Sequence, residues 1–443
     1  MVKALSWHET NLRWFVLCLI GVYPLAQFLI AEFPALLGEQ IKNYFQVTQE
    51  DVNYLLLFES LPNMIMTLVG GLIIDAFGVR RSYVLFGIVV ILGQFLCLIS
   101  VFLQSFKLMI IGRFVFGIFE SSGCVAESYY INKWFKDKEN SFAYGIDTAL
   151  CRIGSITASI LYPFLYSASD NDLSRCLLMC LKIAIFSFIT ILILTQIDRF
   201  SDMRDKVEDQ KLESIDLRQI KNFSLEFYIT LISCATCYSV FFIFSYNSVE
   251  MFKQNFKLDQ NTANILFSIP YYLSALLSPI VGYYLQRIGR NIEILIIACS
   301  CQLLTLTMFQ MLPEFDSPCL IFPLIGSILN GLFFGIYFAV MWPYIPNIVP
   351  SHMVATGFGL IYSCINLELT CFSYIVANIL RVENYENYLK MNSLLLLLSF
   401  IGFISLIYLL FSNQSKQRNS NHSQSNETDS TIQIELMVLC KQT

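Results

Sequence analysis

The sequence predicts an all-α membrane protein with twelve transmembrane helices arranged in two halves of six. Of its 443 residues, 56% are hydrophobic and only 14% are charged, and the mean hydropathy is +0.60. Soluble proteins carry about 25% charged residues, so this chain cannot cover its apolar surface in water. Apolar runs of about 20 residues, long enough to cross a bilayer as helix, recur from end to end. Lipid is therefore the predicted solvent of most of the chain.

The apolar runs account for most of the sequence. Their approximate ranges are 14–37, 53–75, 83–105, 108–131, 143–167, 177–197, 225–249, 262–285, 292–312, 318–345, 353–380 and 390–412. Each is predicted to be a helix, because backbone polar groups in lipid must be satisfied within the segment and the runs lack the alternation of barrel strands. The first run is too long for the apolar region of a signal peptide, so we expect it to remain as a membrane anchor.

Polar segments divide the chain into five parts. Residues 1–13 are a predicted cytosolic N-terminus, 14–197 a first six-helix bundle, 198–224 a cytosolic linker, 225–412 a second six-helix bundle, and 413–443 a cytosolic tail. Most Lys and Arg residues outside the helices fall on the side of the termini and the linker, which predicts that this side is cytosolic. The tail is rich in Ser, Asn and Gln and is predicted to be disordered.

Composition and residue usage argue against several classes of function. The net charge is −5 and there is no basic domain, so no nucleic-acid partner is predicted. The cysteines lie mostly in apolar runs, where Cys packs as a small hydrophobe. The histidines are His8, His352 and His422, none at the centre of a predicted helix, so we expect no metal and no other cofactor. With no phosphate-binding loop and no nucleophile paired with a histidine, the chain is not predicted to be an enzyme.

A short motif occurs twice, between the second and third helix of each half. The first copy consists of Gly71, Asp75, Gly78, Arg80 and Arg81, and the second of Gly282, Gly289 and Arg290, with Gln286 in the place of the acid. The first glycine of each copy permits close helix approach, and the second permits a sharp turn. Asp75 would lie at a cytosolic helix end, where an arginine or a helix N-terminus from the other half could bind it.

We therefore predict that this motif forms an ionic contact between the halves that opens and closes. The second copy lacks the acid, so its contact is predicted to be weaker. The alternative is that the charges only anchor the loops at the lipid headgroups.

Ionisable residues also occur inside the predicted helices, where a charge near the bilayer centre costs about 2.5–3.5 kcal/mol. They are Glu32, Glu59, Arg113, Glu120, Glu127, Asp147, Arg152 and Glu368. Arg113, Glu120 and Glu127 are spaced by seven residues and share one helix face. Glu120, Arg152 and Glu368 lie near the midpoints of three different helices. We expect these three to meet at a central cavity, where carriers built from repeats bind substrate.

The motif that occurs twice resembles the loop between helices 2 and 3 in the major facilitator superfamily. At the start of the fourth helix, "GRFVFGIFESSG" is similar to a second superfamily pattern through Arg113 and Gly117. Within the superfamily, "NKWFKDKE", "CRIGS" and "MWPYIPNIVPSHMVATGFG" resemble the lysosomal dipeptide transporters. This resemblance implies the superfamily fold and a loop motif that stabilises the outward-open state.

The same resemblance implies alternating-access export of dipeptides from the lysosome lumen to the cytosol by facilitated diffusion (uniport). It also implies an endolysosomal membrane, with the vacuole or plasma membrane as alternatives, and a glycosylated lumenal accessory protein as partner.

A dipeptide carries a carboxylate and an ammonium, and the charged residues suit both groups. The predicted substrate-binding residues are Arg152, Glu120, Glu368, Glu127 and Tyr130. The planar guanidinium of Arg152 can bind a carboxylate bidentately, and the resemblance implies that the arginine of "CRIGS" contacts substrate. Glu120 or Glu368 suits the ammonium, although the family's own acid falls at Ser121, which is about 100° further around the helix than Glu120. An ion pair between Arg152 and Glu120 is the alternative.

Glu32 stands where relatives have an acid before Asn-Pro-Ala, so it is predicted to form a lumenal gate; the alternative is a partly hydrated helix end. Two other functions stay open. One is a proton- or ion-coupled carrier of sugars, organic anions or amino acids, with Glu32, Glu120 or Asp147 carrying protons. The other is a non-transporting sensor or accessory membrane subunit.

Overall fold

The structure is a computed structural model that describes residues 10–47, 49–135, 139–170, 172–205, 217–380 and 384–439. The first half contains α1 (Leu12–Ala31), α2 (Phe33–Leu36), α3 (Gly38–Phe45), α4 (Gln49–Phe77), α5 (Val79–Phe102), α6 (Phe106–Trp134), α7 (Asn140–Ala168) and α8 (Leu173–Asp205). The second half contains η2 (Leu217–Asn222), α9 (Leu225–Phe256), α10 (Gln260–Ile288), α11 (Asn291–Met311), α12 (Ile321–Ile348), η3 (Ser351–Met353), α13 (Val354–Ile379) and α14 (Tyr385–Leu439).

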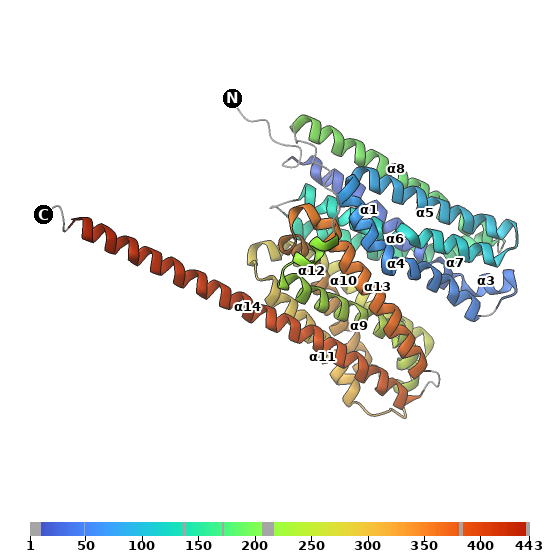
Figure 1. Ribbon diagram of the computed structural model, residues 1–443. Coiled ribbons are helices and arrows are strands. Elements are labelled where there is room, and N and C mark those ends of the chain that lie inside the picture. Colours follow the sequence, from blue (N-terminus) through green and yellow to red (C-terminus); the bar gives the residue numbers. More distant parts are fainter. Residues whose placement is uncertain are drawn as a thin grey trace.

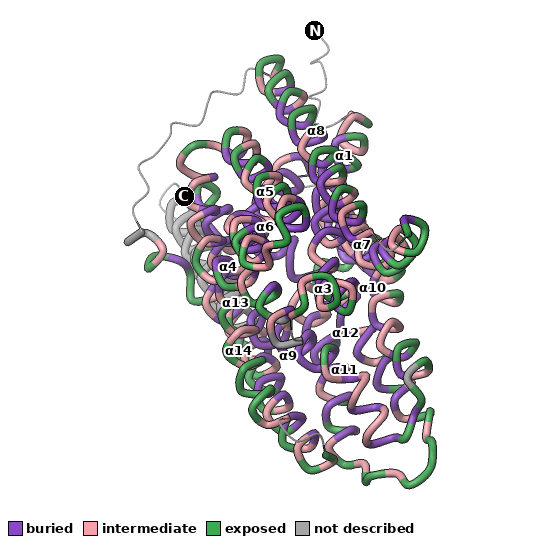
Figure 2. The backbone as a smooth tube through the Cα atoms, turned by 90° about the vertical axis from the view of Figure 1, so that its right-hand side faces the viewer, coloured by how far each residue is buried: buried purple, intermediate pink, exposed green. Residues whose placement is uncertain are grey.

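Twelve of the described helical segments are long and apolar enough to cross a membrane, which confirms the predicted fold class. Figure 1 shows the halves as two bundles, the first in blue to green and the second in yellow-green to red. Buried residues lie mainly on the inside of each bundle and exposed residues on the outside (Figure 2). Many of the exposed residues are large and apolar. Ile65 and Phe102, for example, are each 69% exposed. An apolar outer surface of this extent suits a protein that is surrounded by lipid.

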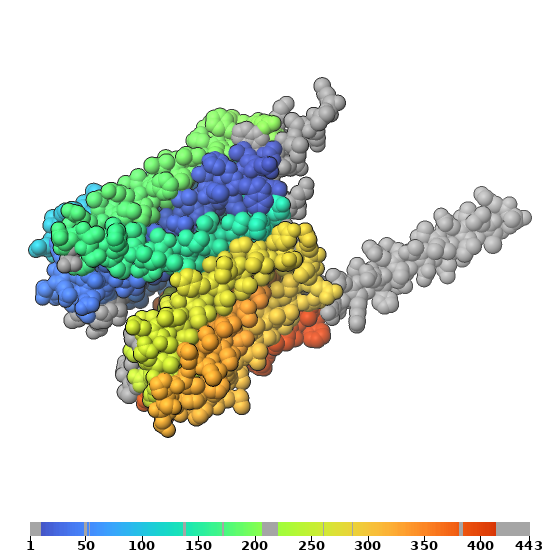
Figure 3. Space-filling model, turned by 180° about the vertical axis from the view of Figure 1, so that it is seen from behind, coloured from blue at the N-terminus to red at the C-terminus, as the bar shows by residue number. Residues whose placement is uncertain are grey.

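The two halves meet along two pairs of helices, α4 with α13 and α7 with α10. Gly71 of α4 lies where a Cβ would collide with the backbone oxygen of Ala355, and Gly282 of α10 occupies the matching position against Ser141. These backbones approach because neither glycine has a side chain. Figure 3 shows the halves in contact at this end of the molecule, with a groove between them at the opposite end. The contact end is the one predicted to be cytosolic.

Asp75 connects the halves at that end. Its Oδ2 accepts hydrogen bonds from the backbone N of Thr356 at 2.7 Å and from the Thr356 hydroxyl at 2.6 Å. Thr356 lies in the first turn of α13, so the carboxylate occupies the position where free N–H groups and the helix dipole favour an anion. The sequence predicted either an arginine or a helix N-terminus as the partner of Asp75, and in the structure the partner is the N-terminus of α13. The Gln286 side chain, which replaces the acid in the second copy, lies outside the described side chains.

The arginines of the motif do not join this contact. Arg80 donates from Nε to Asp198 Oδ2 at 2.7 Å and also pairs with Asp202, and both acids are on α8 of the same half. Lys133 Nζ donates to both carboxylate oxygens of Asp198, at 2.8 and 2.9 Å. These pairs join the start of α5 and the end of α6 to α8, so they fix the first half near the point where Asp75 contacts the second. Arg81 and Arg290 are exposed.

The second glycine of each motif copy has the positive φ that a sharp turn between two helices requires. Gly78 has φ +82° and Gly289 has φ +65°, and these left-handed values suit residues without a Cβ. Each ends one helix and begins the next within one or two residues.

Two predicted boundaries differ from the structure. Residue 198 was expected to begin the linker, but α8 continues to Asp205 because Asp198, fully buried, is held by Arg80 and Lys133. The central part of the linker, 206–216, lies outside the described residues. The tail was predicted to be disordered, yet α14 continues as helix to Leu439 and projects away from both bundles (Figure 1).

The Asp75 contact yields a first prediction. Asp75→Ala removes a charge-assisted contact of about 1.5–3 kcal/mol, which shifts the balance from the closed to the open form of this end by roughly tenfold or more. Distances between spin labels placed across the end, on α4 and α13, should lengthen in the variant.

Arg81→Ala serves as the matched control in the same loop, since its side chain is exposed. If both variants change the label distances equally, the charges act by anchoring the loop to headgroups, and the contact between halves is not what closes this end.

Candidate functional site

A cavity of about 260 Å³ lies between the two halves. Its wall from the first half is polar and charged, with Glu120, Glu127, Asp147 and Arg152 among its residues. The described residues of the second half that line it are uncharged and largely aromatic, and they include Tyr238, Phe338, Trp342 and Tyr362. Tyr246 of α9, also in the wall, is 66% exposed, so the cavity opens toward the groove end.

Among the described residues that line the cavity, Arg152 of α7 is the only basic one. It is only 3% exposed, and its guanidinium lies over the rings of Phe334 at 4.4 Å and Phe28 at 5.2 Å. In the described part of the chain no carboxylate is within ion-pair distance of it, and its Nε has no hydrogen-bond partner. The ion pair with Glu120 considered from the sequence is therefore absent. A buried guanidinium without an anion is unfavourable, so this position favours binding of an anionic group.

Glu120 of α6 has polar partners of its own. Its Oε2 accepts hydrogen bonds from Asn63 Nδ2 at 3.0 Å and from Ser121 Oγ at 2.6 Å. Both Glu120 and Ser121 line the cavity, so the one-residue shift from the family's acid still leaves a carboxylate in the wall. Sequence analysis did not single out Asn63, because a lone amide in an apolar run gives no periodic signal.

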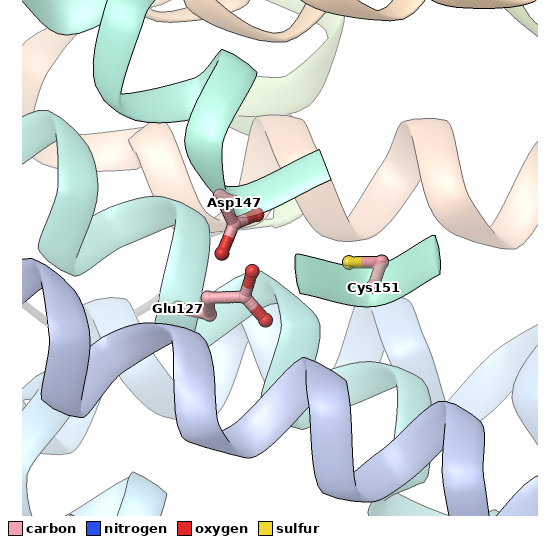
Figure 4. Close-up of side chains that lie close together, drawn as sticks. All are labelled: Glu127, Asp147 and Cys151. Atoms are coloured by element: carbon pink, nitrogen blue, oxygen red, sulfur yellow. The ribbon is translucent and has the colours of Figure 1, made fainter. Parts of the chain in front are cut away.

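Glu127 and Asp147 face each other from α6 and α7 (Figure 4). They are 3% and 7% exposed, and a ligand atom from each, together with the Cys151 sulfur, all lie within 4.8 Å of one another. The sequence placed both acids inside helices but could not pair them, since the pairing depends on how two helices pack. These atoms are close enough to share one cation.

Arg113 and Gly117, the two residues of the motif predicted at the start of the fourth transmembrane helix, are in α6 and do not line the cavity. Arg113 is fully buried, forms an ion pair with Glu59 and donates to the backbone oxygen of Ala31 at 3.2 Å. Gly117 lies where a Cβ would collide with the Glu59 backbone oxygen. The motif therefore packs α6 tightly against α4 and positions the wall that contains Glu120.

Tyr130 and Glu368, predicted to bind substrate, do not line the cavity. Tyr130 is fully buried in the core of the first half, with its ring 5.9 Å from that of Tyr83. Glu368 is half-buried on α13, whereas its neighbours Asn366 and Leu369 face the cavity. Consecutive residues of a helix point in directions about 100° apart. Knowing that a residue lies near the middle of a helix therefore does not show whether its side chain faces the cavity.

Glu32 lies at the break between α1 and α2, where Pro34 begins a new helical turn. Ser155 Oγ of α7 donates to Glu32 Oε1 at 3.2 Å. The residue is thus part of a junction between α1 and α7 on the groove side of the molecule, and its role as a gate stays a prediction.

The aromatic wall of the second half is a preformed surface. The rings of Trp342 and Tyr362 stack at 4.7 Å with an interplanar angle of 17°, and Tyr238 lies 4.8 Å from Phe338. Such faces contact apolar and cationic groups without fixed hydrogen-bond geometry. The cavity therefore combines charged groups on one side with an adaptable aromatic surface on the other.

Comparison with known proteins now identifies this architecture. The family model described as Major Facilitator Superfamily matches residues 16–367 and 229–439. The chain therefore belongs to the major facilitator superfamily, and it is a transporter of small solutes rather than an enzyme. Among solved structures, it is similar to the human organic anion transporter MFSD10 (TETRAN), with TM-score 0.65 and 13% identity over 90% of this chain and 100% of that one. It is also similar to the proton:xylose symporter XylE, with TM-score 0.67 and 12% identity over 90% and 96%.

Curated relatives cover most of the chain. The mouse (Mus musculus) protein named lysosomal dipeptide transporter MFSD1 is 30% identical over 383 residues, which are 84% of this chain and 81% of the relative. The Danio rerio protein of the same name is 28% identical over 80% of this chain and 77% of the relative.

The buried Arg113–Glu59 pair yields a second prediction. Glu59→Gln leaves the guanidinium of Arg113 buried without its counter-charge, which should destabilise the protein by about 3–5 kcal/mol. Thermal unfolding of the detergent-purified variant should occur at a clearly lower temperature than that of the wild type.

Glu59→Gln combined with Arg113→Met removes both charges and should recover part of this loss. An unchanged unfolding temperature in the single variant would show that the pair does not hold α4 and α6 together.

Proposed function

We propose that this chain carries dipeptides from the lysosome lumen to the cytosol by alternating access. The observation that carries the proposal is the unpaired guanidinium of Arg152 in a cavity that also contains the Glu120 carboxylate. These groups match the opposite charges at the two ends of a dipeptide. The names of the relatives, which are lysosomal dipeptide transporters, support the same substrate class and the lysosomal membrane.

Each wall of the cavity receives a role in this proposal. Arg152 binds the substrate carboxylate bidentately, because its planar fork matches two oxygens. Glu120 binds the ammonium, and Asn63 and Ser121 hold its carboxylate in place. The aromatic surface around Trp342 and Tyr362 contacts variable side chains. A site of this kind distinguishes a dipeptide from a sugar by its two charges while it tolerates different side chains.

Movement of substrate follows from the contacts between the halves. The cavity opens toward the groove, which is the predicted lumenal side, while Asp75 and Thr356 close the other end. Breaking this contact and closing the groove would turn the same site toward the cytosol. Export needs no energy source other than the dipeptide gradient, in keeping with the facilitated diffusion that the resemblance implies. A glycosylated accessory protein at the lumenal surface remains part of the proposal.

A second candidate mode is proton-coupled carriage. It is favoured by the Glu127–Asp147 pair, two neighbouring buried acids in the cavity wall. The substrate ammonium needs one acid, which Glu120 already supplies in the proposal, so this pair could hold a proton.

Counterflow in liposomes tests the proposal. The purified protein is reconstituted with unlabelled dipeptide inside, and uptake of labelled dipeptide is compared with uptake of glucose, lactate and a free amino acid under matched loading. Dipeptide should exchange and the other solutes should not. Arg152→Ala should raise the half-saturating dipeptide concentration by roughly tenfold or more, since a charged hydrogen bond is worth about 1.5–3 kcal/mol.

Arg152→Lys, which keeps the charge but loses the planar fork, is the matched variant and should fall between the two. Full exchange in Arg152→Ala would remove Arg152 from the site. Flux of another solute without dipeptide exchange would contradict the substrate class, and binding without any flux would favour a sensor.

A further inference from the structure

Three side chains with metal-binding atoms meet in the cavity wall. Asp147 and Cys151 are four residues apart on α7 and therefore lie on one face of that helix, and Glu127 faces them from α6 (Figure 4). One carboxylate oxygen of each acid and the Cys151 sulfur all lie within 4.8 Å of one another. All three residues line the cavity, so an ion that enters through the groove can reach them.

The two acids of this cluster have no counter-charge. Glu127 and Asp147 are 3% and 7% exposed, and Oε2 of the first and Oδ1 of the second have no hydrogen-bond partner in the described structure. Neither acid belongs to an ion pair of the described residues. Arg152, five residues after Asp147 on α7, instead lies over the Phe334 ring. Two buried carboxylates without a cation are unfavourable, and a bound cation would relieve their repulsion.

The residue types indicate which ion fits. A thiolate is a soft ligand that favours Zn²⁺ and similar ions, whereas Mg²⁺ and Ca²⁺ prefer oxygen ligands alone. Zinc is bound tetrahedrally at about 2.0–2.3 Å, which places its ligand atoms roughly 3.4–3.7 Å apart. Modest side-chain rotations bring the three atoms of the cluster to that spacing, and cavity water takes the fourth position.

Binding of the ion has a simple proton balance. The Cys151 thiol loses its proton to water when its sulfur binds the metal, and both acids bind as carboxylates. The three ligands then carry three negative charges against the two positive charges of the ion. Because no histidine takes part, the sequence did not predict this site.

The cluster lies at the inner end of the cavity. Asp147 precedes Arg152 by five residues on α7, so it lies about 7 Å nearer the closed end. Gly145, two residues away, lies where a Cβ would collide with the Ser278 backbone oxygen of α10. The cluster is thus directly before the α7–α10 contact, on the path that substrate must take once these helices separate.

An ion in this position competes with substrate for space and for charge. The cavity has a volume of about 260 Å³, and each water that the ion keeps takes about 30 Å³ of it. Glu120 lies two helical turns from Glu127 on the same face of α6, at a rise of about 10 Å. The positive charge of the ion therefore opposes binding of an ammonium group at Glu120.

We propose that Glu127, Asp147 and Cys151 bind one divalent cation of the zinc type and that the bound ion inhibits transport. The ion enters from the groove and is held between α6 and α7. It acts as an inhibitor and not as a co-substrate, so dipeptide transport itself stays facilitated diffusion. The metal site stands on the geometry of the three side chains, whereas its effect on dipeptides rests on the proposed function.

Zinc binding is tested first without substrate. Tag-free protein in detergent is mixed with one equivalent of Zn²⁺, and X-ray absorption at the zinc edge should show one sulfur ligand at about 2.3 Å and oxygen ligands at about 2.0–2.2 Å. Cys151→Ser should lose the sulfur signal. Cys124→Ser, the matched control in the same cavity wall, should keep it. A wild type without a sulfur ligand, or a sulfur signal that survives in Cys151→Ser, would overturn the site.

Inhibition is then measured by dipeptide counterflow, with free Zn²⁺ set by a metal buffer because dipeptides themselves bind the ion. Each variant's rate with zinc is divided by its own rate without zinc. The Zn²⁺ concentration for half inhibition should be roughly tenfold or more higher in Cys151→Ser and in Asp147→Asn than in the wild type and in Cys124→Ser, since even the residues that support metal ligands are worth about 10–100-fold in affinity.

The outcomes separate the two proposals. Equal inhibition of all four proteins, or zinc bound through Cys151 without inhibition of the wild type, would overturn the inhibitory role. Zinc bound through Cys151 in a protein that performs no dipeptide counterflow would support the metal site and contradict only the substrate class.

Discussion

The Asp75 carboxylate at the start of α13 is the interaction on which the form of the molecule depends. The first copy of the motif makes this contact between the halves through charge-assisted hydrogen bonds from the backbone N–H and the hydroxyl of Thr356. It thereby uses a free N–H group of the kind that every helix start offers. With this end closed, the groove at the other end gives access to the cavity. The glycines at 71 and 282 make the closed end compact, because they let backbones of opposite halves touch. A pair of hydrogen bonds to one carboxylate is weak enough to be broken in each cycle.

The charges of the molecule are divided between structural and functional positions. Arg113 with Glu59, and Arg80 with Asp198, are paired inside the first half and fix its helices. Arg152 is left without a counter-charge at the cavity. The charges of these two pairs are already compensated within the first half. The Arg152 guanidinium has ring contacts but no counter-charge among the described residues, so it would gain most from an anion. The described cavity residues of the second half are largely aromatic and uncharged. In the proposed function, ionic recognition and side-chain contact therefore belong to different halves.

The sequence predicted the twelve helices, since each is a long apolar run whose backbone has no alternative in lipid. It also predicted that Asp75 could bind an arginine or a helix N-terminus of the other half, because the carboxylate would lie at a cytosolic helix end. The sequence could not predict which side chains line the cavity or which acids meet, because these features depend on how each helix is rotated and packed. Glu368 and Tyr130 lie on faces that midpoint position does not specify, and Glu127 meets Asp147 only because α6 packs against α7. The role of Asp198 was hidden because a polar stretch at a helix end looks like a linker.

The central claim is that the unpaired Arg152 in the cavity is the binding site for the substrate's carboxylate. A structure of the protein with a bound dipeptide, determined by cryo-electron microscopy in the same groove-open form, would test it most directly. The account predicts density for the dipeptide between the two walls, with its carboxylate against the Arg152 guanidinium and its ammonium near Glu120. Dipeptide density away from Arg152, or a direct Arg152–Glu120 ion pair in the occupied cavity, would contradict it.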